Sequence, residues 1–325
     1  LESEMGGGGM GDLFGGGEDS GGDMQFSERQ AKFAQLKRAD KTMKKLAEMI
    51  TNSAPEIDEK VFGGAKSLTT LENRLTQSEK RTEILNSLAE YLLSLYAVVD
   101  VTARKLVNKQ MTQVIDKQNK GEFAKNPLYD LVEMLPEFNV QSKDALDYWM
   151  ESGYDFLSDY YWDRSYQNAQ DIANKITDAI SETLRKGYTG KDALDRVKAV
   201  RGQYTNTVLR TNLASAYNTA RVEEFQEYTD LYPAYRYVAV GDTRTRPSHK
   251  YLDGMVFDAE KDKELIKELT GPNGYNCRCS MVPVSKYEMD NEQIKNGIKR
   301  RKQLDMNKIQ DILKFNNMSP ALATR

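Results

Sequence analysis

The sequence predicts a mainly α-helical protein, a long helical arm followed by a small α+β C-terminal module with a few short strands. Between residues 65 and 120 there is no glycine or proline, and apolar residues recur three and four positions apart. That spacing places them on one face of a helix. A segment rich in β-formers first appears at 234–240. The 325 residues leave room for two domains or three.

The N-terminal part is expected to be a disordered tail and then a helical arm. Residues 1–25 hold ten of the 22 glycines and six acidic residues but no basic ones. Such a composition buries too little apolar surface to offset chain entropy. The arm is placed at 26–184, with breaks predicted at Pro55 and at Gly63 and Gly64.

Within the arm, residues 65–120 are predicted to form one long helix or two nearly collinear ones. About fifty helical residues would span about 75 Å, a length typical of bundles, coiled coils and assembly proteins. A connector is expected at 121–136, then helices at 144–151 and 154–186. The last helix begins with an aromatic stripe, which is more typical of a core than of a base-stacking surface, and Gly187 is predicted to end it.

The module is placed at 185–285, and a basic helical tail at 286–325. Pro283 cannot donate a backbone hydrogen bond, so the last strand is predicted at a sheet edge. The predicted helices are 191–201, 204–230 and 259–269, the strands 234–240, 255–257 and 280–284, and a polar loop covers 241–249.

The composition excludes several classes of protein. Two cysteines are too few for a disulfide scaffold, and a single histidine excludes a site built from several imidazoles. No stretch approaches the roughly 18–20 apolar residues of a membrane span, and no secretory signal is evident, so no membrane contact is expected. No phosphate-binding glycine motif is present, and no catalytic residue is assigned.

The residues that could carry chemistry are concentrated in the module. His249, Cys277 and Cys279 are candidate zinc ligands, with Asp242 or Asp253 as a candidate fourth. The spacing is C-x-C rather than the usual C-x2-C of structural zinc sites. A cluster held by hydrogen bonds is therefore an open alternative, and so is an active centre with His249 as a base.

The tail carries a run of four basic residues. Residues 286–325 contain nine Lys and Arg against five Asp and Glu, although the whole chain has a net charge of −3. The run, Lys299, Arg300, Arg301 and Lys302, is interpreted either as a solvated helix face or as a contact for nucleic acid or an acidic partner.

Taken together, several blocks resemble the phage Mu protein F-like head morphogenesis domain of phage minor capsid proteins, over about residues 185–285. The first block is a helix reading RTNLASAYNTAR, and the others follow it in a fixed order. Many relatives have a Pro-rich or His-containing stretch just before the NCRC block, where this chain has Gly274 and Tyr275, and a glutamate where this chain has Asn212. The residues that carry the resemblance are Arg210, Thr211, Asp242, Arg244, His249, Gly254, Asn276, Cys277, Arg278 and Cys279.

The resemblance implies a non-enzymatic minor head protein that acts in procapsid assembly at or near the portal. It would reside in the virion, in the head interior or at the portal vertex, and in the host cytoplasm during assembly. Its partners would be the portal protein, other head proteins and, through Lys299 to Lys302, double-stranded DNA without sequence preference. Oligomeric state stays open. The alternative is an enzyme or toxin-like effector with its active centre at Asp242, His249, Cys277 and Cys279.

Overall fold

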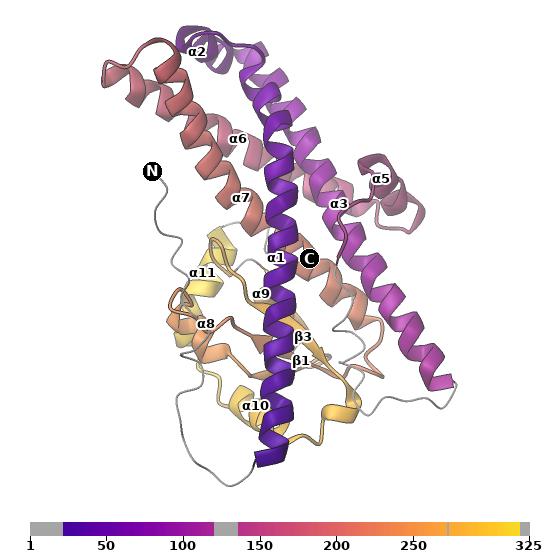
Figure 1. The fold of residues 1–325 in the computed structure, drawn as a ribbon. Helices are drawn as coiled ribbons and strands as arrows, with labels where there is room; N and C mark the ends of the chain where they lie inside the picture. The colour runs from indigo at the N-terminus through magenta and orange to yellow at the C-terminus, as the bar shows by residue number, and fades with distance from the viewer. Residues whose placement is uncertain (1–21, 120–135, 272, 319–325) are drawn as a thin grey trace.

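The computed structural model describes residues 22–119, 136–271 and 273–318 (Figure 1). The predicted tail at 1–25 therefore lies outside the described residues up to position 21, and helix α1 begins at Gly22. Nearly all of the predicted connector at 121–136 lies outside them as well.

Long helices running side by side form the arm (Figure 1). Helix α3 has 42 residues, about 63 Å at 1.5 Å per residue, and packs against α1, α2, α5, α6 and α7. The prediction that the aromatic stripe of α6 is core is confirmed in part: Tyr161 is buried and stacks on Tyr96 at 5.0 Å and on Trp149 at 5.5 Å between ring centroids, whereas Phe156 is exposed. The helices of the arm are α1 (Gly22–Phe62), α2 (Leu68–Thr76), α3 (Ser78–Asn119), α5 (Ser142–Glu151), α6 (Phe156–Arg185) and α7 (Gly190–Gln226).

The stretch 65–120 forms two helices rather than one. The Ser67 side chain caps α2 by accepting from the Thr70 backbone N–H at 3.2 Å, which satisfies one of the unpaired donors of its first turn. Gln77 then adopts an extended conformation with ψ 122°. A helical residue would have ψ near about −42°, so α3 starts afresh at Ser78.

Two predicted helix breaks are wrong, because packing outweighs local propensity. Pro55 lies inside α1 although proline costs about 3 kcal/mol there; Ile50, Ile57 and Val61 of the same helix are all buried and offset that cost. Gly202 lies inside α7, which is continuous where two helices were predicted. The break at Gly63 and Gly64 is confirmed, with φ +44° and +72°.

A small antiparallel sheet lies at one end of the arm, with strand order β2-β1-β3. Tyr235 of β1 pairs with Phe257 of β2 and with Pro283 of β3, so β3 is an edge strand, as Pro283 predicts. The predicted loop at 241–249 is partly wrong, because Pro247 starts a short helix that carries His249. The elements are β1 (Ala234–Val238), α8 (Pro247–Leu252), β2 (Val256–Asp258), α9 (Lys263–Thr270) and β3 (Ser280–Val284).

The tail packs onto the sheet. Ile309 and Ile312 belong to the same buried cluster as Tyr235 and Tyr237, and Ile294 packs with residues of all three strands. The closest approach is at Gly297, where an added Cβ would lie 2.5 Å from the Gly254 carbonyl oxygen and from Val256. The tail elements are η2 (Lys286–Glu288), α10 (Glu292–Lys302), η3 (Met306–Ile309) and α11 (Gln310–Met318).

The arm and the sheet share helices. On α7, Leu213 belongs to the large core of the arm, whereas Phe225 belongs to the core beneath the sheet. On α3, Leu92 and Val107 divide in the same way. The boundary predicted at residue 185 therefore separates helices that pack together, and the sheet is held on an extension of the arm.

A buried ion cluster lies where α3, α5 and α7 meet. The Arg104 guanidinium donates to Asp100 at 2.8 Å and to Glu223 at 2.6 Å, and it lies 3.4 Å from Glu224. The Trp149 indole N–H also donates to Asp100, at 2.9 Å. Burial by itself would lower the pKa of Arg104, but Asp100 and Glu223 outweigh it, and the pKa is raised.

Part of α3 is long and apolar enough to cross a membrane by length and composition, contrary to the sequence expectation. Within Ser78–Asp116 one 18-residue window has a mean hydropathy of 1.4. However, 67% of that window is buried inside the protein. Its apolar character is therefore accounted for by its central place in the helical layer.

Candidate functional site

Three predicted zinc ligands lie together in the structure. The ligand atoms of His249, Cys277 and Cys279 all lie within 4.8 Å of one another. His249 Nδ1 is 3.2 Å from Cys279 Sγ and 3.6 Å from Cys277 Sγ. His249 comes from α8, whereas the two cysteines end the loop before β3, so the cluster joins segments that are 28 residues apart or more.

Two hydrogen bonds fix the part of α8 that carries His249. The Ser248 hydroxyl donates to Asp311 of the tail helix α11 at 2.7 Å, and the Asp253 backbone N–H donates to the His249 carbonyl at 3.1 Å. The Asp253 carboxylate in turn accepts from the Ala239 backbone N–H at 2.9 Å. His249 is 2% exposed, so its position is fixed by the fold.

The cysteine loop is fixed by α7. Asn276 has φ +55°, a left-handed conformation that asparagine tolerates better than most residues. Its backbone N–H donates to Thr211 Oγ1 at 3.0 Å. Thr211 and the NCRC block were separate parts of the sequence resemblance, and this hydrogen bond connects them.

Tyr237 of β1 is a further polar group at the cluster. Its hydroxyl lies 3.1 Å from His249 Nδ1, and the side chain is fully buried. The opposite ring nitrogen, Nε2, is buried without a hydrogen-bond partner among the described residues. Three groups therefore surround Nδ1, which is the arrangement that a shared ion or proton would produce.

The two thiols differ in their tendency to ionise. A hydrogen bond from Cys277 lowers the pKa of Cys279, and hydrogen bonding with His249 adds to this, although burial opposes it. The pKa of Cys277 is raised well above its usual value by the same hydrogen bond and by burial. A thiolate at Cys279 is thus favoured, and thiolate is the form that binds metals and acts as a nucleophile.

Asp242, the predicted fourth ligand, is engaged elsewhere. Its carboxylate accepts from Arg278 at 2.6 Å, from Thr245 Oγ1 at 3.0 Å and from the Arg244 backbone N–H at 3.1 Å. Burial would raise its pKa, but these bonds outweigh that effect and lower it. Asp242 is not one of the clustered ligands in the described part of the chain; it holds Arg278, the residue between the two cysteines.

The basic run has mixed roles. Arg300 donates to the backbone carbonyls of Asp253 and Tyr251, each at 2.8 Å, and Arg301 donates to Asp262 at 2.7 Å. Two of the four cations thus help to hold α10 on the sheet. Lys299 and Lys302 are exposed.

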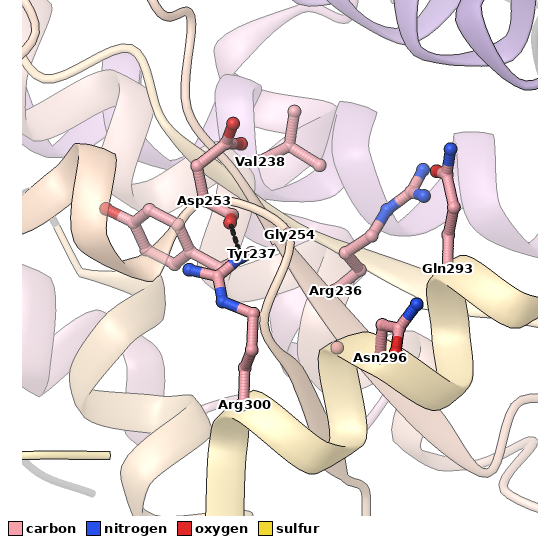
Figure 2. A pocket seen from close by; sticks show the side chains of 9 residues that line it. Arg236, Tyr237, Val238, Asp253, Gly254, Gln293, Asn296 and Arg300 are labelled. Atoms are coloured by element: carbon pink, nitrogen blue, oxygen red, sulfur yellow. Dashed lines mark hydrogen bonds between the residues drawn. The ribbon is translucent and has the colours of Figure 1, made fainter. Parts of the chain in front are cut away.

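A polar cavity that sequence reasoning missed lies between β1 and α10 (Figure 2). Its volume is about 320 Å³. Figure 2 shows Arg236 on the strand facing Gln293 and Asn296 of α10. The sequence signal is weak, because alternation along the strand shows only that Arg236 lies on the opposite face from Tyr235 and Tyr237. The lining residues are Arg236, Tyr237, Val238, Asp253, Gly254, Gln293, Asn296, Gly297 and Arg300.

The region that contains this site matches a known family of phage proteins. Residues 170–282 match the family described as phage Mu protein F like protein. The chain therefore carries a phage Mu F-like domain, as the sequence blocks predicted. The match begins inside α6, before the predicted boundary at 185, and runs through most of β3.

Three relatives are similar over part of the chain. An 89-residue segment is 39% identical to the Mu-like prophage FluMu F protein of Haemophilus influenzae and covers 27% of this chain and 21% of that protein. An 83-residue segment is 40% identical to the putative capsid assembly protein F of Escherichia phage Mu, with coverages of 26% and 18%. The third relative is an uncharacterized protein of Methanocaldococcus jannaschii, 26% identical over 159 residues, with coverages of 49% and 23%.

These similarities have a limited extent. Each alignment covers between 18% and 23% of the relative's own length. No solved structure matches the chain. The comparisons thus identify the domain that contains the His249 cluster, and the function of the whole protein is a separate question.

Proposed function

We propose that the protein is a phage head assembly protein, and more narrowly a minor head protein that acts at or near the portal while the procapsid forms. The observation that carries the proposal is the Mu F-like domain at 170–282. A relative of 40% identity is named putative capsid assembly protein F, which supports the same role. We infer that the protein resides in the virion and, during assembly, in the host cytoplasm.

The shape supports this role. The arm places helices of 41 and 42 residues beside one another, each about 60 Å long, with the sheet at one end (Figure 1). A rod of that length lets the sheet dock on one head protein while the far end of the arm contacts another. The portal protein and other head proteins are the proposed partners.

The test is genetic and structural. In a phage that encodes the chain, we expect deletion of the gene to abolish the yield of filled heads, and the intact chain supplied in trans to restore it. A chain without residues 170–282 should fail to restore the yield. Affinity-tagged protein from infected cells should co-purify with the portal. Normal numbers of filled heads after deletion would contradict the proposal.

DNA contact is a narrower part of the proposal and rests on Lys299 and Lys302. Both side chains are exposed on α10, whereas Arg300 and Arg301 are engaged within the protein. Contact through two lysines would be electrostatic, independent of sequence and weakened by salt.

The measurement is DNA affinity over a salt series. The double variant K299E/K302E should bind less tightly and lose about one unit of salt slope for each phosphate contact removed. The control is K186E, because Lys186 is an exposed lysine at the C-terminal end of α6. An affinity independent of salt, or an equal effect of K186E, would refute the contact.

A thiol-dependent enzyme or effector is the second candidate. The observation in its favour is the 3.2 Å distance between His249 Nδ1 and Cys279 Sγ, which is the separation of a base and the nucleophile it activates. A nucleophilic Cys279 would react rapidly with iodoacetamide in the chain as purified. Slow alkylation of Cys279 would remove this candidate.

A further inference from the structure

We propose that His249, Cys277 and Cys279 bind one zinc ion that joins α8 to the start of β3. The proposal does not depend on head assembly, since the geometry alone carries it. Two sulfurs and one imidazole nitrogen form the donor set, which suits zinc among the common biological metals.

The distances agree with a tetrahedral ion. Zinc lies about 2.3 Å from a thiolate sulfur and about 2.05 Å from an imidazole nitrogen, so two such ligands at a tetrahedral angle are about 3.6 Å apart. His249 Nδ1 lies 3.2 Å and 3.6 Å from the two sulfurs. Both nitrogen–sulfur distances are therefore within a few tenths of an ångström of those that a shared ion requires.

Zinc binding would release protons from the site, because a metal ligand must be deprotonated. Cys277 and Cys279 would each bind as a thiolate, so each thiol proton passes to solvent when the ion binds, and His249 would bind as the neutral imidazole through Nδ1.

The fourth coordination position of the zinc ion would lie on the side of Tyr237. Its hydroxyl is 3.1 Å from Nδ1, about the spacing expected of a neighbouring oxygen ligand in a tetrahedral site. Either this hydroxyl or a water molecule hydrogen-bonded to it completes the coordination. Asp242 does not, since its carboxylate is held by Arg278.

The location explains what the ion would do. The sheet has strands of three and five residues, and strands this short bury little apolar surface. A crosslink between residues at least 28 positions apart restricts the unfolded chain and adds binding free energy to folding. The ion would therefore stabilise the Mu F-like domain.

The first experiment uses the full chain, purified under reducing conditions. Elemental analysis should find one zinc per chain, a chelator should lower the melting temperature, and added zinc should restore it. Cobalt(II) should give an intense thiolate-to-metal absorption band. No retained zinc, together with no such band in excess cobalt, would overturn the proposal and leave a cluster held by hydrogen bonds.

Variants identify the ligands. C277S and C279S should each weaken cobalt affinity more than loss of a residue that only hydrogen-bonds to a ligand, which costs roughly 10–100-fold. Y237F should retain the thiolate band with a smaller loss of affinity. The control D242N should keep one metal per chain, and unchanged affinity in C279S would overturn the assignment.

Alkylation decides the matter even if a cysteine variant does not fold. In the unmodified chain, zinc should slow the reaction of both cysteines with iodoacetamide at least tenfold, and a chelator should reverse the protection. Equal rates with and without zinc would refute the proposal. This readout is independent of phage assembly, so failure of the two proposals can be told apart.

Discussion

Replacing Arg104 by methionine should destabilise the protein more than any other single change to its ion pairs. Arg104 has a side-chain exposure of 2%, and its partners Asp100 and Glu224 have exposures of 1% and 9%. Methionine fills much of the space beneath Tyr154, whose ring lies 4.2 Å from the guanidinium. It supplies no charge, so the carboxylates are left buried without a cation.

The expected loss is about 3–5 kcal/mol, the range found when one partner of a buried ion pair is removed. The control is K186M, which removes an ion pair to Glu182 whose side chains are 57% and 54% exposed. Such exposed pairs contribute about 0–1 kcal/mol. Urea denaturation followed by circular dichroism measures both variants on the same scale.

The pH dependence adds a second readout. Burial raises the pKa of Glu223, and the charge of Arg104 opposes that effect, so removal of Arg104 should raise this pKa further. Protonation then relieves the unfavourable charge, so the difference between R104M and wild type should shrink as pH falls from 7 toward 5. A loss below about 1 kcal/mol at neutral pH, equal to that of K186M, would refute the reasoning.

Three further predictions concern the C-terminal part of the chain, from α7 to the tail. G297A should cost about 1–3 kcal/mol of unfolding free energy, because its Cβ would lie 2.5 Å from the Gly254 carbonyl oxygen. The control G202A, where an added Cβ meets nothing within 4 Å, should instead stabilise the protein by up to about 1 kcal/mol. Equal effects of the two variants in urea denaturation would contradict this prediction. T211V keeps the shape but removes the acceptor of the Asn276 N–H, so it should cost about 1–3 kcal/mol; a melting temperature equal to that of wild type would show that the bond is dispensable. Burial raises the pKa of Glu288 although Ser285 and Arg236 oppose it, so the native state binds this proton more tightly than the unfolded chain does. The free energy of unfolding should therefore fall as pH rises from the pKa of Glu288 in the unfolded chain to its higher pKa in the native state. E288Q should remove this slope, and an unchanged pH profile would refute the assignment.

Local patterns in the sequence predicted most of the secondary structure. The strands at 234–240, 255–257 and 280–284 were found within two residues of their ends, because alternation and β-branched residues differ clearly from the helical pattern. The errors at Pro55 and Gly202 share one cause. Both residues disfavour a helix locally, and packing against distant segments outweighs that preference.

The grouping of His249, Cys277 and Cys279 was predicted in part. Residue type alone indicated His249, Cys277 and Cys279, because imidazole and thiol side chains are rare in this chain. The choice of Asp242 as fourth partner relied on its place in the same loop as His249. The structure pairs it with Arg278 instead, a contact that depends on how the loop and β3 come together.

The sequence by itself determined the helical arm, the three short strands, the domain family and the residue types of the cluster, since each depends on local periodicity or on a contiguous motif. Only the tertiary structure decided which atoms meet. It placed Tyr237 beside His249, buried Arg104 among carboxylates from two helices, and used Arg300 to hold the tail on the sheet. These contacts join residues far apart in the chain, and their energies depend on burial, which no local pattern specifies.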